Sequence, residues 1–145
     1  MQSNKNLAFE LQNVIGQLKR ANSLKHGHSN LKGAEKHVLI LISELKKNGP
    51  VTTSEIANKI GVTLAAVTHQ VNALEKEGLI ERMQDKEDRR IAFIELSEKG
   101  GVQVAKLKKE FAQKIQKLTN FLGDKDTRTL IHLIKKIADF PEFTK

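Results

Sequence analysis

The sequence predicts a mainly α-helical fold that carries one small β-hairpin. Apolar residues recur at three- and four-residue spacing along most of the 145 residues, and only nine Gly and two Pro interrupt them. Residues 79–83 and 91–96 differ, because they are rich in β-forming residues and flank a charged segment, 84–90. A chain of this length is expected to form one domain with its own hydrophobic core.

The first two helices are predicted from their apolar spacing. A helix at about residues 5–24 places five apolar side chains at helical intervals, namely Leu7, Leu11, Val14, Ile15 and Leu18. A second helix at 34–47 contains the apolar run 38–42, which a buried strand could also show. The length of this segment and the Asn48-Gly49-Pro50 stop favour a helix.

Two short helices follow, joined by a tight turn. Thr52 and Glu55 stand at capping-box spacing before a helix that ends at Gly61. Thr63 can cap the next helix, which is expected to run to about Glu77. This pair, preceded by the helix at 34–47 and followed directly by the hairpin, has the order of a winged helix-turn-helix.

Two further helices complete the predicted order. Ser97 begins a long helix to about Leu122, Gly123 closes it, and a last helix begins at Asp124 or Asp126. The sequence therefore predicts six helices, with a hairpin after the fourth.

Composition narrows the classes of function. The formal net charge is +8, which favours anionic partners. Cysteine is absent, so cysteine-based redox sensing, thiolate metal sites and cysteine nucleophiles are excluded. Six Phe with no Trp or Tyr disfavour a nucleic-acid binder that works by base stacking. The aliphatic run 38–42 is too short to span a membrane, and residues 1–19 do not resemble a signal peptide, so we expect a soluble cytoplasmic protein.

The second helix of the helix-turn-helix has a polar outer face. Val67, Val71 and Leu74 are predicted to point into the core. Small and polar residues that can contact base edges, thymine methyls or phosphates then lie outside or at the margins: Thr63, Ala65, Ala66, Thr68, His69 and Asn72. This pattern favours entry into a DNA major groove. An ordinary solvated surface helix would show the same pattern.

The hairpin loop adds Arg89 and Arg90, which can enter a narrow minor groove. Asp85, Glu87 and Asp88 lie beside them and would repel phosphate unless they orient the arginines. The loop could equally be a solvated charged turn. Net charge does not point to this region, since it is +5 for residues 1–50, −2 for 51–100 and +5 for 101–145.

These residues resemble the MarR family of transcriptional regulators. Asp88-x-Arg90, five residues and then Leu96-Ser97-x-x-Gly100 is similar to the family's wing signature, with Ser where the signature has Thr. Val67-Thr68-His69, followed by Leu74-Glu75-x-x-Gly78-Leu79, is similar to its recognition helix. The order of six helices and a hairpin matches over nearly the whole chain.

The resemblance implies a homodimeric regulator in which residues 1–145 form one MarR-type domain. Residues of about 34–100 would form the DNA-binding lobe, and 1–33 and 101–145 the helical dimerisation region. By position, the DNA-facing residues would be Thr63, Ala65, Ala66, Thr68, His69 and Asn72. Arg90 or Arg89 would reach the minor groove, with Asp88 as a structural partner. Two departures are His69, where the family commonly has Arg, and Gly101 after Gly100, which should loosen the start of the long helix.

The expected function is therefore sequence-specific binding to a pseudo-palindromic, double-stranded operator. We expect a repressor that is released by a small-molecule effector, with a small apolar anion as the candidate. One alternative is a zinc-responsive regulator, for which His37 and His26-x-His28 offer ligand types. Residues 104–113, where zinc-sensing members have further His, contain none, which favours ordinary histidines and no metal site.

A second alternative is a nucleoid-type protein that binds DNA without sequence preference. An enzyme is not expected, because the chain has no Walker loop, no Gly-x-Ser-x-Gly and no His-Glu-x-x-His, so we assign no catalytic residue and no cofactor. The operator, the regulated genes, the identity and existence of an effector, and the sign of regulation stay open.

Overall fold

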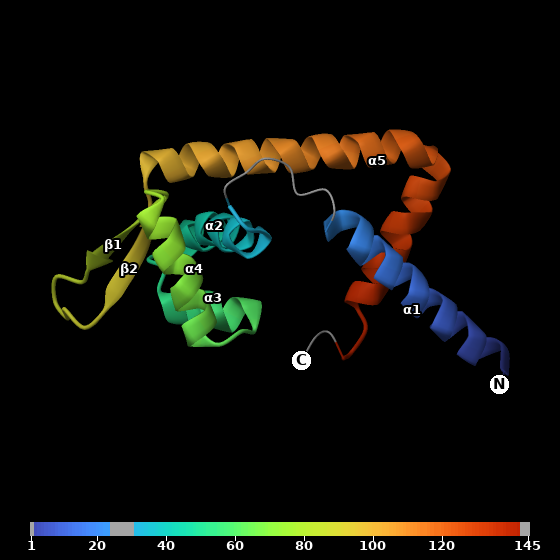
Figure 1. Ribbon diagram of the computed structural model, residues 1–145, viewed down its shortest axis with the longest axis horizontal. Helices are drawn as coiled ribbons and strands as arrows, with labels where there is room; N and C mark the ends of the chain where they lie inside the picture. The colour runs from blue at the N-terminus through green and yellow to red at the C-terminus, as the bar shows by residue number, and fades with distance from the viewer. Residues whose placement is uncertain (1, 24–30, 143–145) are drawn as a thin grey trace.

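The computed structural model describes residues 2–23 and 31–142 and is mainly helical, with one two-stranded antiparallel hairpin (Figure 1). The elements in chain order are α1 (Gln2–Ser23), α2 (Gly33–Leu45), the 3₁₀ turn η1 (Lys46–Asn48), α3 (Thr53–Ile60), α4 (Leu64–Lys76), β1 (Ile80–Gln84), β2 (Ala92–Leu96) and α5 (Glu98–Ala138). Helices α2 to α4 and the hairpin form a compact lobe beneath one end of α5. The predicted fold class is confirmed.

The helix-turn-helix is built by the local signals that the sequence carries. The Thr52 hydroxyl accepts from the Glu55 amide at 3.2 Å, and the Glu55 carboxylate accepts from the Thr52 amide at 2.8 Å. Gly61 ends α3 with φ 75°, a left-handed conformation that glycine adopts without strain. The Thr63 hydroxyl then caps α4 by accepting from the Ala66 amide at 3.2 Å. The predicted capping box, turn and cap are confirmed.

The hydrophobic core lies inside the lobe. Its buried residues come from every element of the lobe and from the first turns of α5: Leu31, Val38, Leu39, Ile42, Val51, Ile56, Ala57, Val67, Val71, Leu74, Leu79, Ile80, Ile94, Val104 and Leu107. The three inward positions predicted on α4 are all fully buried. Together these side chains fix how α4 is held against the rest of the lobe.

The hairpin differs from the prediction in two details. Strand β1 covers 80–84 where 79–83 was expected, and β2 begins at Ala92 rather than at 91. Val51 also forms a one-residue β-bridge to Ile94, whose amide donates to the Val51 carbonyl at 2.7 Å. A single buried residue after a proline has no strand periodicity, which is why the sequence did not reveal this bridge.

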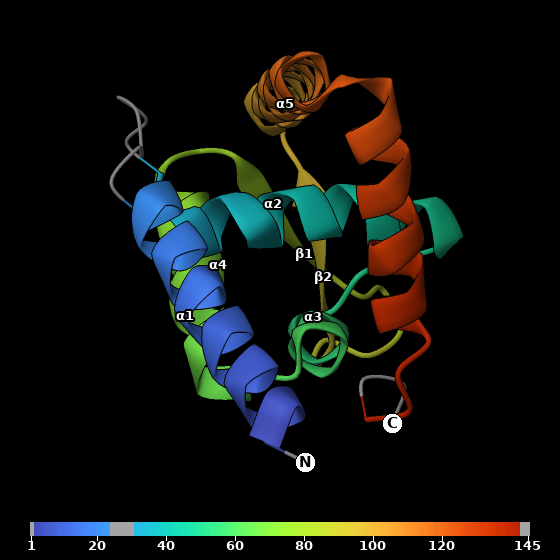
Figure 2. The same cartoon turned by 90° about the vertical axis from the view of Figure 1, so that its right-hand side faces the viewer.

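Helix α5 contains both of the helices expected after the hairpin. Gly123 has φ 75° and ψ 171°, and two helical segments meet there without a connecting loop. The bend is visible at the far end of α5 in Figure 1. Figure 2 shows that the segment beyond the bend and α1 lie on opposite sides of that view. The predicted break at Gly123 is confirmed, and this one residue provides the whole turn.

Close contacts join the C-terminus of α4 to the start of α5. The Ser97 hydroxyl donates to the Gly78 carbonyl at 2.6 Å and accepts from the Gly100 amide at 2.9 Å. Gly100 is buried, and a Cβ there would lie 1.9 Å from the Leu79 carbonyl oxygen. Only glycine fits this approach, so the Leu-Ser-x-x-Gly run has a packing role. The weakening expected from Gly101 does not stop α5 from running through both glycines.

An ion-pair cluster joins the C-terminal part of α2 to α5. Glu44 pairs with Lys47, at 2.8 Å, and with Lys108 of α5. The side-chain hydrogen bond from Lys108, followed by that from Lys47, lowers the pKa of Glu44 to about 2. The carboxylate therefore stays charged well below the usual range for Glu.

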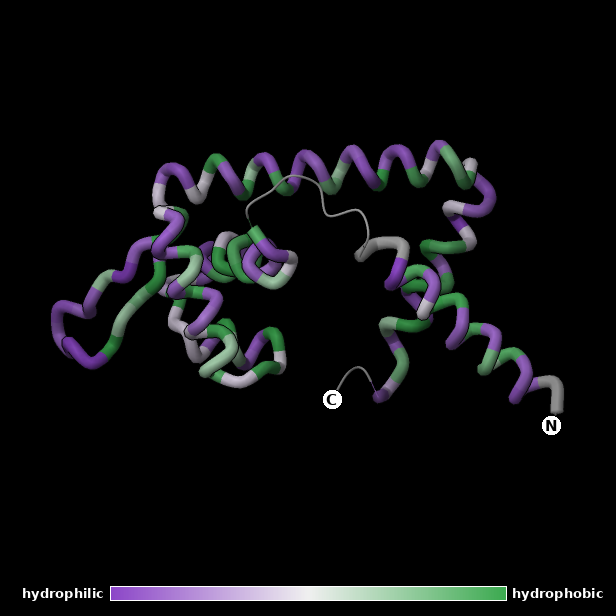
Figure 3. The backbone as a smooth tube through the Cα atoms, viewed as in Figure 1, coloured by the Kyte–Doolittle hydropathy of each residue, from purple (hydrophilic) through white to green (hydrophobic). Residues whose placement is uncertain are grey.

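Helix α1 and the distal part of α5 leave apolar side chains uncovered. On α1, Phe9 is 66% exposed and Leu18 70%. On α5, the row Phe111, Ile115 and Leu118 is exposed between 41% and 64%. Figure 3 shows apolar segments recurring along both helices. Within residues 2–23 and 31–142, no helix is long and apolar enough to cross a membrane.

Candidate nucleic-acid interface

The outer face of α4 is open along its length. Ala65, His69 and Asn72, which were predicted opposite the buried stripe, are exposed, and so is Ala66, which was predicted at the margin of that face. We call these four residues the reading face. Small side chains occupy the first turn and polar ones the middle, so the N-terminal half of the helix can approach a surface closely.

Two threonines border the reading face, and their hydroxyls are partly committed to the helix. Thr63 accepts the Ala66 amide, which leaves its hydroxyl proton available. Thr68 donates to the Leu64 carbonyl at 2.8 Å, which leaves its oxygen available as an acceptor. Thr63 can therefore donate to a phosphate oxygen, whereas Thr68 must first give up its bond within the helix.

Two apolar residues at the tip of the helix-turn-helix were missed from the sequence. Val62 is 43% exposed and Leu64 52% exposed, beside Ala65 at the start of α4. An apolar residue in the first turn of a helix is equally compatible with burial, so periodicity gave no signal. Their exposure adds contact surface for thymine methyls and sugars.

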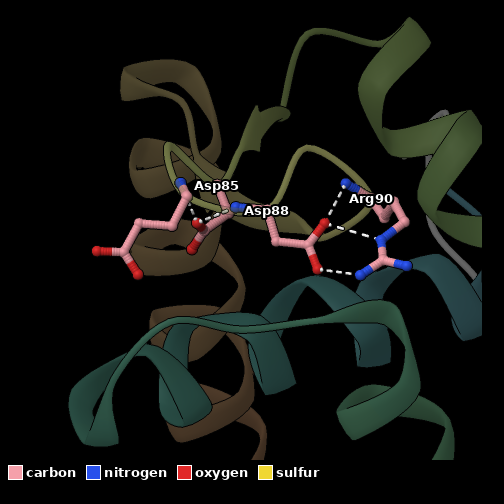
Figure 4. Close-up of polar contacts among 4 residues, drawn as sticks. Asp85, Asp88 and Arg90 are labelled. Atoms are coloured by element: carbon pink, nitrogen blue, oxygen red, sulfur yellow. Dashed lines mark hydrogen bonds and ion pairs between the residues drawn. The ribbon is translucent and has the colours of Figure 1, made fainter.

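The wing loop between β1 and β2 is ordered by two aspartates (Figure 4). The Asp85 carboxylate accepts the backbone amides of Glu87 and Asp88 at 2.6 and 2.9 Å. The backbone amides of Asp85 and Ile91 close the loop by donating to the carbonyls of Ile91 and Asp88. These carboxylates thus bind the loop's own amides and fix its conformation.

Asp88 also holds Arg90. Its carboxylate accepts from Arg90 Nε at 3.0 Å, from Nη2 at 2.9 Å and from the Arg90 amide at 3.0 Å. The Arg90 side-chain hydrogen bond, and then the backbone one, lower the pKa of Asp88, while the Asp88 bond raises the pKa of Arg90. The Arg90 side chain is still 90% exposed, so its remaining donors face outward. The sequence left open whether the carboxylates orient the arginines; Asp88 does so for Arg90.

Arg89 has a different environment. It is exposed and, among the residues that the structure describes, it forms no hydrogen bond or ion pair. Its charge is therefore uncompensated, whereas that of Arg90 is shared with Asp88. The loop presents one fixed and one unrestrained guanidinium.

A further cation, Arg82 on β1, was missed from the sequence. It pairs with Glu75 and its Nη2 donates to Asn72 Oδ1 at 2.6 Å, both on α4. The only signal in the sequence was that Arg82 lies two residues after the buried Ile80 on β1, so both side chains belong to the same face of the strand. The contact depends on how the strand and the helix pack, which the sequence alone does not show.

The described residues offer no metal centre, because residues 2–23 and 31–142 contain no group of three or more His, Asp or Glu side chains that could hold an ion. His37 is exposed on α2. The other proposed ligands, His26 and His28, lie outside the described residues.

Comparison with known proteins identifies the lobe. The MarR family model matches residues 35–92, which include α3, α4 and the wing loop. Transcriptional regulator AdcR of Streptococcus pneumoniae is 34% identical over 92 residues, covering 61% of this chain and 60% of AdcR, so the match spans less than two thirds of either protein. Residues 35–92 of the chain therefore match the MarR family. The HTH-type transcriptional repressor MdtR of Bacillus subtilis is a second relative, 28% identical over 72% of this chain and 67% of MdtR. Both are named as transcriptional regulators, neither as an enzyme.

Solved structures of MarR-family proteins share the fold beyond the lobe. Streptococcus pneumoniae FabT in complex with DNA matches with a TM-score of 0.69 and 24% identity, covering 99% of this chain and 98% of that one. A mutant of MarR from E. coli matches with a TM-score of 0.64 and 26% identity, covering 74% and 78%. The likeness to FabT extends to α1 and α5, and it confirms the architecture expected from the resemblance.

Proposed function

We propose that the protein is a transcriptional regulator that binds a specific double-stranded operator. The observation that carries this proposal is the pairing of an open reading face on α4 with a wing whose Arg90 is fixed by Asp88. A helix face and a fixed cation at one end of the same lobe can contact a major groove and the adjacent minor groove. FabT, whose fold this chain shares, is solved in complex with DNA, which is consistent with the proposal.

In the proposed complex, α4 enters the major groove. The residues assigned to DNA on α4 are Thr63, Ala65, Ala66, Thr68, His69 and Asn72, and the wing contributes Arg89 and Arg90. Asp88 acts through Arg90 and does not itself touch DNA. A regulator of this kind works in the compartment that holds the DNA, which is the cytoplasm in our expectation.

The regulator acts as a homodimer. Residues of about 34–100 form the DNA-binding lobe, and residues 1–33 and 101–145 form the helical dimerisation region. Support comes from the apolar side chains that these helices leave exposed, because isolated soluble domains rarely expose apolar surface of that extent. A two-fold axis would set the two α4 helices about 34 Å apart, matching a pseudo-palindrome with half-sites ~10 bp apart.

Repression with release by a small apolar anion is the regulatory form that we propose. The Lys and Arg of residues 101–145, ten against five acidic residues, supply charge for a carboxylate. Such a ligand releases DNA only if it binds more tightly to the dimer whose two lobes are spaced wrongly for the operator half-sites than to the dimer whose lobes fit them. Titration of operator binding with salicylate-like acids tests this. An operator affinity that is unchanged at saturating acid excludes that compound as the effector.

Selection of bound DNA from a random library tests the central proposal. The wild-type protein should enrich a two-fold-related site, and its affinity for that site should exceed that for random DNA by at least ~10³-fold. His69→Glu places a carboxylate on the reading face and should abolish the enrichment. Gln113→Glu adds the same charge on α5 and serves as the matched control. Equal affinity for all sequences would instead support the nucleoid-type alternative.

A further inference from the structure

The contact between α4 and the wing strand fixes one side chain of the reading face. Arg82 lies on β1 directly opposite Ile94, and its guanidinium reaches across to α4. One side of the guanidinium pairs with Glu75, and Nη2 donates to Asn72 Oδ1 at 2.6 Å. The Arg82 side chain is only 30% exposed, although Asn72 is on the open face.

The chemistry of arginine determines which end of the Asn72 amide faces the wing. A guanidinium has five N–H donors and no acceptor, so the Asn72 atom beside it has to be the carbonyl oxygen. The amide NH₂ is on the other branch of the same planar group. With its oxygen turned towards Arg82, Asn72 presents its NH₂ donors to an incoming base.

We propose that Arg82 is a specificity-determining residue that acts through Asn72. Held in this way, Asn72 pairs with the acceptor edge of guanine, N7 and O6, or with thymine O4. It does not make the two-bond contact to adenine, which needs the amide oxygen to accept from N6 while the nitrogen donates to N7. This inference rests on the proposed function, since it concerns DNA read by α4.

Arg82 is poorly placed to be a phosphate ligand itself. Glu75 compensates its charge, and both of its terminal nitrogens already have partners on α4. Its role is that of a positioning residue. Removing Arg82 alone would also expose the Glu75 carboxylate to phosphates, so a clean test has to change both residues together.

The test compares operator selections for four proteins. Asn72→Ala identifies the base position that Asn72 contacts, because preference is lost there. The wild type should prefer G or T at that position. The Arg82→Met/Glu75→Gln pair keeps the net charge and removes the guanidinium donors from Oδ1, so adenine should become accepted there. Asn72→Asp keeps an acceptor for Arg82 but turns an acceptor outward, and should shift the preference towards C.

A second measurement uses the wild-type protein alone. Replacing the contacted guanine by 7-deazaguanine, or the contacted thymine by 4-thiothymine, removes or weakens the acceptor. Wild-type affinity should fall about fivefold, the worth of one neutral hydrogen bond. The Asn72→Ala affinity should not change. Melting curves show whether the double variant folds, and if it does not, the base-analogue series decides the matter.

Three results would overturn the inference: a wild-type preference for A or C at this position, an unchanged preference in the folded double variant, or no position altered by Asn72→Ala. Each is distinct from failure of the proposed function. If DNA recognition itself were wrong, the wild-type protein would enrich no site in the selection.

Discussion

Arg90 provides a prediction whose size follows from the geometry of the wing. Its guanidinium is fixed by Asp88 and is 90% exposed, so it is presented to a DNA backbone at little cost in side-chain entropy. Arg90→Ala removes this cation and leaves the Asp85 loop bonds in place. We expect weaker binding with a smaller dependence on salt.

The magnitude comes from counterion release. Each phosphate that is neutralised contributes ~0.9 to the slope of log affinity against log salt. A dimer carries two copies of Arg90, so the slope should fall by about 1.8. The ratio of wild-type to Arg90→Ala affinity should then shrink by roughly twelvefold between about 50 and 200 mM salt. If Arg90 responds to minor-groove width, the loss should also be larger on A·T-rich flanks.

Fluorescence-anisotropy titrations of a selected site at several salt concentrations measure this slope. Asp88→Asn is the control, since it keeps the Arg90 charge but weakens the contact that fixes the guanidinium. In this variant the salt slope should not fall, but the preference for A·T-rich flanks should decrease. Because Arg90 lowers the Asp88 pKa, the pair persists when the pH falls from about 7 to 5 and is lost only as the pH passes through the depressed value. An unchanged slope for both Arg90→Ala and Arg89→Ala would remove the wing from the mechanism.

Three further predictions concern the scaffold. In Gly100→Ala the new Cβ would lie 1.9 Å from the Leu79 carbonyl oxygen, so the variant should lose about 3 kcal/mol of stability and its melting temperature should fall by roughly 10 °C. Gly101 has open space around it, so Gly101→Ala should not be destabilised. Equal effects of the two substitutions would contradict the packing role of Gly100. The pKa of Glu44 is lowered from 4.5 to about 2 in the folded protein, so its ion pairs stabilise the fold above pH 4.5 and this stabilisation is lost as the pH falls towards 2. In urea unfolding, the free energy of unfolding should therefore fall less on acidification in Glu44→Gln than in the wild type. Equal decreases in the two proteins would refute the pairing. Leu118→Glu should shift sedimentation from dimer to monomer, while Gln113→Glu, about 140° around the helix, should not; a wild type that is already a monomer at micromolar concentration would count against the dimer.

Local signals made the lobe predictable from the sequence. The Thr52–Glu55 capping box and the turn at Gly61 act within three or four residues, so the sequence contains the whole interaction. The buried stripe of α4 follows from helical periodicity in the same way. Asp88 and Arg90 are two residues apart, which is why their pairing could be anticipated from the wing signature.

Contacts between elements were not predictable in this way. Arg82 meets Asn72 ten residues away only because β1 packs beside α4. The approach of Gly100 to Leu79 likewise depends on where α5 leaves the hairpin. The basic excess of the terminal segments does not point to the proposed interface, whose residues lie in the segment with a net charge of −2. Our proposal therefore rests on the shape of the lobe and on its fixed cations and not on total charge.

Footprinting of the selected operator tests the central claim most directly. Hydroxyl-radical cleavage and guanine-methylation interference together report which grooves a bound protein covers. The account predicts a two-fold-symmetric pattern, with major-groove interference in two half-sites ~10 bp apart and minor-groove protection on the outer flanks where the wings would lie. Protection with no symmetry, or interference confined to phosphates at positions that vary from molecule to molecule, would contradict it.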